Sequence, residues 1–295
     1  MRVTTSFLDL TTFQKLSNLS GKGKNNLGSF LRNHYFTFMD SRAQLKQFLD
    51  AKAALYNQPS FIEKDPVSMP HSFTLKQDIE ISGLFAAVLA WGNRTTIINN
   101  CRKLMVWMDN KPHDFILHHK DTDLKPFVHF AHRTFNATDL LYFISFLQHH
   151  YRQYDSLEDA FVPGKHYKAD NVEAALIHFH SHFFSIDHPL RTRKHISTPL
   201  RNSACKRLNM YLRWMVRKDA AGVDFGIWKK IKPRQLVCPL DVHVARVAER
   251  LGLLGNIKSN WVNALQLTGR LKELNPDDPA IYDYALFGLG MAERF

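Results

Sequence analysis

Two residues with reactive side chains begin two neighbouring helical patterns in this sequence. Lys206 carries a primary amine, and Asp241 carries a carboxylate. An amine with a cationic neighbour, here Arg207, favours the neutral form that attacks an electrophilic carbon. A carboxylate beside it can take up a proton or stabilise a developing positive charge. The simpler interpretations are a solvated lysine and an aspartate that caps a helix, contributing about 1 kcal/mol.

The elements that would position these two residues are amphipathic helices over residues 206–217 and 242–251. Each has apolar residues at the spacing that forms one face of a 3.6-residue helix. These residues are Leu208, Tyr211, Leu212 and Met215 in the first helix, and Val244, Val247, Ala248 and Leu251 in the second. Gly252 follows the second helix as a stop signal. We expect both faces to be buried.

The opposite face of the first helix is basic. Lys206, Arg213 and Arg217 return close to one line, which predicts a cationic stripe about 16 Å long. The whole chain has 295 residues and a formal net charge of +12. Clustered basic side chains neutralise phosphates and release counterions, so this charge favours a polyanionic partner.

The sequence around Asp241 resembles a known family. Residues 238–253, CPLDVHVARVAERLGL, are similar to the P-[VL]-D-x-H-x-x-R segment of the helix-hairpin-helix (HhH-GPD) DNA glycosylases. The segments CKRLNMYLRWMVR (205–217) and VDFGIW (223–228) are closer to the archaeal 8-oxoguanine glycosylase branch and to a related uncharacterised bacterial family, DUF2400. The resemblance implies that Lys206 attacks the sugar, that Asp241 is its acidic partner, and that Met210 stacks on the base.

This resemblance implies a fold and an activity. The fold is all-α and two-lobed, HhH-GPD-like, with the site in the interlobe cleft. Residues 42–94 plus 254–295 would form one lobe of a single domain, and residues 95–253 the other. The activity is base-excision repair of damaged duplex DNA without a cofactor. Lys206 would remove an oxidised purine such as 8-oxoguanine and then cleave the strand by β-elimination through a Schiff base, as a bifunctional enzyme.

Further contacts are expected around these two residues. Arg207, Arg213, Arg217, Arg201 and His243 are the predicted DNA-binding residues. A turn with the sequence AWGNR, similar to a helix junction of the same family, adds Trp91 and Asn93 to the expected base pocket. For Trp91 the alternative is a core position at the end of an apolar helix.

The sequence departs from the family at the hairpin before the lysine. The common form is L-P-G-V-G-x-K-T-A, whose glycines allow backbone amides to approach a phosphate. This chain has LRNSAC at residues 200–205 and therefore no glycine at these positions.

The other helical patterns predict a mainly helical chain with few strands. They cover residues 42–56, 75–91, 96–109, 138–152, 156–161, 171–185, 259–273 and 279–291. Residues 1–41 are rich in Ser, Asn, Gly and Lys without a sustained period, so we expect a poorly ordered arm there.

The composition excludes several classes of protein. Three scattered cysteines do not support a disulfide framework or a four-cysteine iron–sulfur cluster. No apolar run reaches the about 18 residues of a membrane span, the best being residues 81–91. The start, MRVTTSFLDL, has one basic residue and no long apolar core, so we expect no secretory signal. We expect a cytoplasmic monomer that binds no metal and no membrane.

Two alternatives stay open at this point. The chain has 16 histidines, and HFHSHFF places His178 and His182 at i and i+4, a spacing that suits a metal ion on a helix. A metal-dependent hydrolase would need a third ligand, which no motif supplies. The other alternative is a helical protein that binds nucleic acid without catalysis. Borohydride trapping, metal content and binding without product distinguish the three hypotheses.

Overall fold

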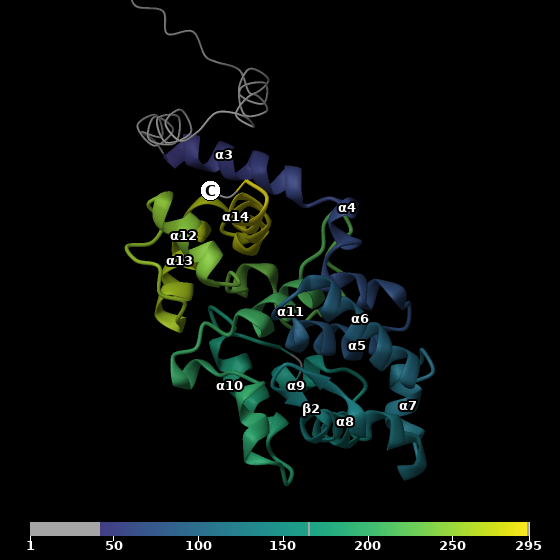
Figure 1. Cartoon of the computed structure of the whole chain (residues 1–295). Coiled ribbons are helices and arrows are strands. Elements are labelled where there is room, and N and C mark those ends of the chain that lie inside the picture. The colour runs from purple at the N-terminus through teal and green to yellow at the C-terminus, as the bar shows by residue number, and fades with distance from the viewer. Residues whose placement is uncertain (1–41, 165, 294) are drawn as a thin grey trace, which may run out of the picture. The chain divides into compact units, whose positions relative to one another are not determined.

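A computed structural model of the chain describes residues 42–164, 166–293 and 295, and these residues are mostly helical. The expected all-α class is confirmed (Figure 1). The only strands among them are β1 (Ala131–His132) and β2 (Phe135–Asn136), which pair antiparallel. The expected arm over residues 1–41 lies outside the described residues. None of the described helices is long and apolar enough to cross a membrane.

The chain divides into two compact units after Gln47, and all the features below belong to the second unit, residues 48–295. The described part of the first unit, residues 42–47, is the start of α3. In chain order the α-helices are α3 (Arg42–Tyr56), α4 (Pro59–Ile62), α5 (Lys76–Leu89), α6 (Arg94–Trp107), α7 (Pro112–His118), α8 (Ala137–Tyr151), α9 (Glu158–Phe161), α10 (Glu173–Phe183), α11 (Lys206–Val216), α12 (Val242–Arg250), α13 (Trp261–Leu274) and α14 (Tyr282–Met291). Short 3-10 turns lie between them, among them η6 (Pro199–Arg201).

The helix α5 is buried on almost every side and packs against α6, α7 and α11. Gly83 allows the close approach of α11, because a Cβ atom there would lie 3.1 Å from Met215 Cε. Buried Glu80 accepts hydrogen bonds from the side chains of Tyr151, Ser156 and Trp228. Burial raises the pKa of Glu80, and the hydrogen bonds from Ser156 and Trp228 oppose the rise. Glu80 thus joins α5 to the end of α8 and to the chain after α11.

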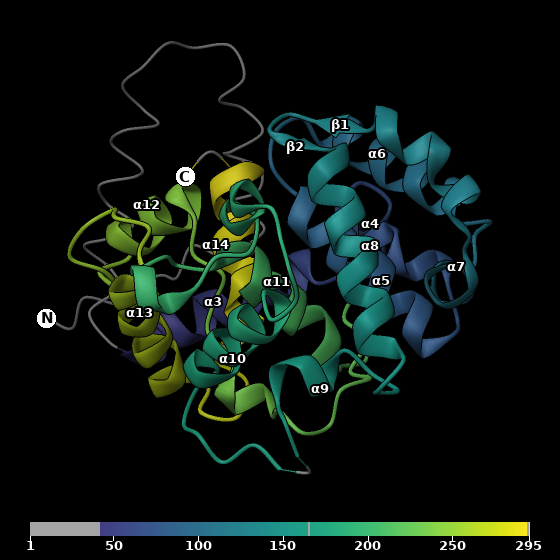
Figure 2. The ribbon, with the colours of Figure 1, turned by 90° about the horizontal axis from the view of Figure 1, so that it is seen from below.

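The helix α11 lies between two groups of helices. In Figures 1 and 2, α5 to α8 lie on one side of it and α12 to α14 on the other. The apolar faces predicted for α11 and α12 are buried, as expected. The helix α12 packs against α14. The assignment of these groups to two glycosylase lobes stays a prediction.

Candidate active site

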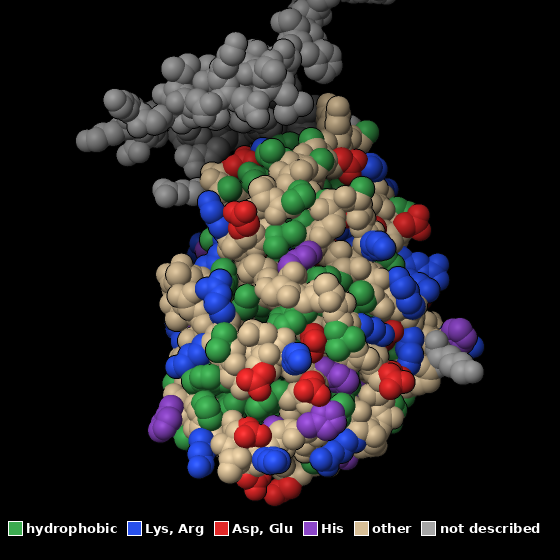
Figure 3. All heavy atoms as spheres, turned by 90° about the vertical axis from the view of Figure 1, so that its right-hand side faces the viewer, with side chains coloured by type: hydrophobic (Ala, Val, Ile, Leu, Met, Phe, Trp, Pro, Cys, Tyr) green, Lys and Arg blue, Asp and Glu red, His purple; other side chains and the backbone are tan. Residues whose placement is uncertain are grey.

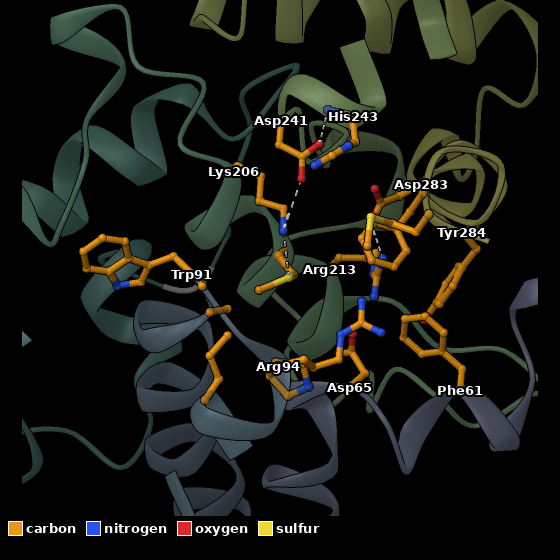
Figure 4. Close-up of a pocket in the computed structure, with 17 residues that line it drawn as sticks. Phe61, Asp65, Trp91, Arg94, Lys206, Arg213, Asp241, His243, Asp283 and Tyr284 are labelled. Atoms are coloured by element: carbon orange, nitrogen blue, oxygen red, sulfur yellow. Dashed lines mark hydrogen bonds and ion pairs between the residues drawn. The ribbon is translucent and has the colours of Figure 1, made fainter. Parts of the chain in front are cut away.

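The structure brings Lys206 and Asp241 together. Lys206 is the first residue of α11, and Asp241 is the N-cap of α12. Asp241 Oδ1 accepts hydrogen bonds from the backbone N–H groups of His243 (2.9 Å) and Val244 (3.0 Å), so the predicted cap is confirmed. The other oxygen, Oδ2, lies 3.7 Å from Lys206 Nζ. Figure 4 shows the two side chains pointing toward each other. Capping therefore fixes one oxygen and leaves the second for the amine.

Both side chains line a cavity of about 260 Å³. This volume lies just below the about 300–1,000 Å³ typical of ligand pockets. Its charged residues are Asp65, Arg94, Lys206, Arg213, Asp241 and Asp283, and its aromatic residues are Phe61, Trp91, Tyr284 and Phe287. Three cations thus face three carboxylates beside aromatic rings, which suits a flat, polar ligand.

Met210 lies one turn after Lys206, with its Sδ atom 3.7 Å from Lys206 Nζ. Its side chain is buried and lines the cavity. A soft, polarisable thioether at this place can pack against the face of a ring. The structure therefore puts Met210 where a base-stacking side chain is expected to lie, and its role stays a prediction.

The hairpin before Lys206 takes left-handed backbone conformations without glycine. Asn202 has φ +52° and Cys205 has φ +48°. Asn202 stands where the common glycosylase motif has its first glycine, and asparagine tolerates this conformation better than most residues. Asn202 also accepts a hydrogen bond from Trp261 N at the start of α13, and Ser203 pairs with Asn260. Asparagine at this position thus takes a left-handed conformation that glycine also adopts.

The structure contradicts the predicted cationic stripe on α11. Arg213 and Arg217 are only 4% and 2% exposed. Arg213 forms ion pairs with Asp224 and Asp283, and its guanidinium stacks on the ring of Tyr284. Arg217 pairs with Asp219, Asp224 and Asp278. Charges buried this deeply must be paired, so Arg213 and Arg217 do not form an exposed cationic stripe.

The half-buried side chain of Arg207 also forms hydrogen bonds within the protein. Its guanidinium donates to the backbone oxygen of Val88, near the end of α5, and to that of His195 at 3.4 Å. Burial lowers the pKa of Arg207. These hydrogen bonds fasten α11 to α5, and DNA binding by Arg207 stays a prediction. Arg201 and His243, in contrast, are exposed, and His243 lines the cavity.

The structure separates the two expected pocket residues of the AWGNR turn. Trp91 is half-buried and lines the cavity, although Figure 4 shows its ring directed away from Lys206. Asn93 is exposed, does not line the cavity and caps α6 by accepting from Thr96 N at 3.0 Å. The predicted pocket role of Asn93 is therefore replaced by a capping role.

The sequence did not predict that two buried acids, Asp65 and Asp283, line the cavity. Burial raises the pKa of Asp283 from 3.8 to about 6, although Arg213 and Lys206 favour its ionised form. Burial likewise raises the pKa of Asp65, while a hydrogen bond from Val67 N and the charge of Arg213 oppose the rise. The Asp65-Pro66 pair in the sequence signals a cap, but no local pattern shows that the carboxylate faces a cavity.

The histidine pair of the alternative hypothesis lies on α10, away from this cavity. His178 Nδ1 donates to Ala160 O (2.9 Å), and His182 Nε2 lies 3.1 Å from His150 Nδ1. Burial lowers the pKa of His150 to about 4. Within the described part of the chain, no group of three or more His, Cys, Asp or Glu side chains is arranged to hold a metal ion.

The comparisons place the chain in one family. Residues 65–292 match the model of a family described as a protein of unknown function, DUF2400, and every cavity residue except Phe61 falls within the match. Neither a search of curated proteins nor a search of solved structures finds a match. Since the family model spans more than half of the sequence, the chain belongs to the DUF2400 family.

Proposed function

We propose that the protein is a bifunctional DNA glycosylase of the helix-hairpin-helix type, a cytoplasmic monomer that excises an oxidised purine from duplex DNA. The observation that carries the proposal is the pair formed by Lys206 Nζ and Asp241 Oδ2, 3.7 Å apart on the wall of a cavity with aromatic residues. A base inside a duplex is out of reach of such a pair. The damaged nucleotide would therefore leave the stack and enter the cavity, at a cost of a few kcal/mol.

The chemistry begins with proton transfer from the Lys206 ammonium to Asp241. The free electron pair of Nζ then attacks C1′ of the sugar, and the bond from C1′ to the base nitrogen breaks with its electrons on the base. The base takes the proton from Asp241, which becomes an ionised carboxylate again. Nζ passes one of its two remaining protons to the ring oxygen O4′ as the C1′–O4′ bond breaks, and the opened sugar is left as a protonated Schiff base. Loss of a proton from C2′ then expels the 3′ phosphate by β-elimination. Asp241 stabilises the positive charge that develops on the sugar, because its Oδ2 already faces this region.

Three further features support this proposal. Met210 Sδ lies beside the amine, where it can contact the face of a base. The aromatic side chains of Phe61, Tyr284 and Phe287 provide additional ring surfaces in the cavity. Asn202 supports the hairpin geometry with its left-handed backbone.

Borohydride trapping tests the proposal. Borohydride reduces an imine to a stable amine, so the wild-type protein should become covalently attached to an 8-oxoguanine duplex or to another member of a panel of damaged duplexes. Undamaged DNA should give no adduct. The variant Lys206→Gln should bind the duplex, keep its fold and form no adduct, because the side chain keeps its polarity but loses the nucleophile.

A matched control is Lys194→Gln, which removes an exposed lysine on the loop before the hairpin and should trap like the wild type. Excision without any trapping would mean that the nucleophile is a water molecule activated by Asp241 and not Lys206. Trapping that persists in Lys206→Gln would move the nucleophile to another amine, with Lys218 tested first. Binding to every duplex without excision or adduct would favour a non-catalytic nucleic-acid-binding protein.

A further inference from the structure

A β-hairpin holds an arginine at the rim of the cavity. The strands β1 and β2 are joined by Arg133 and Thr134, and Arg133 has a left-handed φ of +56°. Its side chain is exposed, and its guanidinium carbon lies 4.6 Å from the centre of the Trp91 ring. Trp91 lines the cavity. The hairpin thus carries a cation onto the outer wall of the candidate site.

Hydrogen bonds fix this arrangement. His132, the last residue of β1, is buried and donates from Nε2 to the backbone oxygen of Trp91 at 3.2 Å. Its Nδ1 atom accepts from the side chain of Asn100 at 2.9 Å. Burial lowers the pKa of His132 and favours the neutral ring that this pattern requires. The hairpin is therefore tied to the same segment that lines the cavity.

Gly92 makes room for the arginine. A Cβ atom at Gly92 would lie 3.1 Å from both Cδ and Nη1 of Arg133, and Gly92 has a φ of +106° that other residues rarely adopt. Gly92 is itself a cavity residue. The guanidinium therefore lies against the backbone of the cavity wall.

Arg133 differs from the arginines of α11 in its electrostatic surroundings. Arg213 and Arg217 are each paired with two or more carboxylates, whereas no Asp or Glu of the described residues lies within ion-pair distance of Arg133. Stacking on Trp91 covers one face of the guanidinium and leaves its N–H edges free to donate. A planar donor set of this kind matches the oxygens of a phosphate.

We infer that Arg133 binds a backbone phosphate of the DNA strand beside the nucleotide that enters the cavity. The contact would hold the strand at the rim while the flipped nucleotide reaches Lys206. Arg133 is thus a positioning residue, and this inference rests on the proposed glycosylase function for its choice of partner. Backbone binding also explains why a cation at this place needs no protein carboxylate.

The test compares the salt dependence of DNA binding. The probe is a duplex that carries a tetrahydrofuran abasic-site analogue, and its dissociation constant is measured between 50 and 200 mM salt, a range chosen because phosphate contacts respond strongly within it. Loss of one phosphate contact in Arg133→Gln should lower the slope of log K against log salt by about 0.9. The same change makes binding about eight-fold weaker at 0.1 M salt. Arg133→Lys keeps the charge and should restore the slope.

Lys103 provides a matched control. Its Nζ atom also lies 4.6 Å from the centre of a tryptophan ring, that of Trp107, and Lys103 is exposed and not a cavity residue. Lys103→Gln therefore removes the same kind of interaction and the same charge elsewhere. Its salt slope should equal that of the wild type. Both variants should unfold at the wild-type temperature, because both side chains are exposed and form no ion pair with the residues that the structure describes.

The outcomes separate this inference from the proposed function. If the wild type traps and Arg133→Gln keeps the wild-type slope, the inference is wrong and the function stands. If the wild type binds DNA but never excises a base, and Arg133→Gln still loses about 0.9 from the slope, the phosphate contact stands and the chemistry fails. If Arg133→Gln and Lys103→Gln lower the slope of log K against log salt equally, the effect is a general one of charge and the inference is wrong. Absence of DNA binding would overturn both.

Discussion

Replacing Asp241 by asparagine separates its two roles, because one oxygen caps α12 and the other faces the amine. The asparagine side chain can still accept the hydrogen bonds from His243 N and Val244 N, so the cap should lose only a few tenths of a kcal/mol. Loss of a negative charge at a helix start costs about 0.3–1 kcal/mol. Loss of the ion pair with Lys206, whose two side chains are 25% and 27% exposed, costs at most about 1 kcal/mol.

The expected destabilisation of Asp241→Asn is therefore about 1 kcal/mol, equivalent to about 2–4 °C in melting temperature. Excision should fall much further. A group that stabilises charge in the transition state contributes about 10²- to 10³-fold to the rate. Single-turnover excision, measured well below the melting temperature of the variant, should show this loss, while binding to a duplex with an abasic-site analogue stays near the wild-type level.

Asp241→Ala serves as the control, because it removes both the cap and the charge. It should be less stable than Asp241→Asn by about 1 kcal/mol but no less active. If Asp241→Asn retained excision within about ten-fold of the wild type, or if activity in the two variants followed stability, Asp241 would be a cap alone and the mechanism would need another acid.

Further predictions concern the buried acids and the glycines. The folded protein holds the pKa of Asp283 at about 6, above its ordinary 3.8, so the stability that its protonated form provides should be lost as the pH rises from about 4 to 6. Chemical unfolding at several pH values should show this decline in the wild type and a weaker decline in Asp283→Asn. Gly288→Ala should destabilise the protein by about 1–3 kcal/mol, since the new Cβ would lie 2.1 Å from the Tyr56 ring. Gly269→Ala, on the open side of α13, should stabilise the protein by about 0.5–1 kcal/mol. Thermal unfolding of the two glycine variants beside the wild type measures both changes.

The sequence predicted the helices well because their signals are local. The expected helix over residues 42–56 coincides with α3, and the helices expected at 75–91 and 138–152 agree with α5 and α8 to within two residues at each end. The helix α7 was missed because Pro112 looked like the end of the preceding helix. Pro112 is instead the first residue of α7, because proline also suits the first position of a helix, where its missing N–H group is not needed.

The candidate site was only partly predictable. Lys206 and Asp241 each begin a helix, and helix starts are visible in a sequence. The environment of Arg213 is not visible, because its partner Asp283 lies 70 residues further along the chain. Periodicity shows which residues share a face, but it does not show that a second layer covers the polar face as well. That layer, formed by α14 and the chain after α11, covers the side of α11 away from α5, and every residue of α11 from Leu208 to Val216 is buried.

The burial of these arginines changes where the basic charge of the protein can act. Arg213 and Arg217 are balanced by four carboxylates, Asp219, Asp224, Asp278 and Asp283. Their role is therefore to hold α14 and the chain after α11 against α11, which fixes the wall opposite Lys206. Figure 3 shows basic and acidic side chains interspersed on one face, with no continuous basic patch there. Under the proposed function, DNA would be held by separate cations near the cavity. Arg133, on its hairpin, is one such cation, because it lies over the ring of the cavity residue Trp91 and has no carboxylate of the described residues within ion-pair distance.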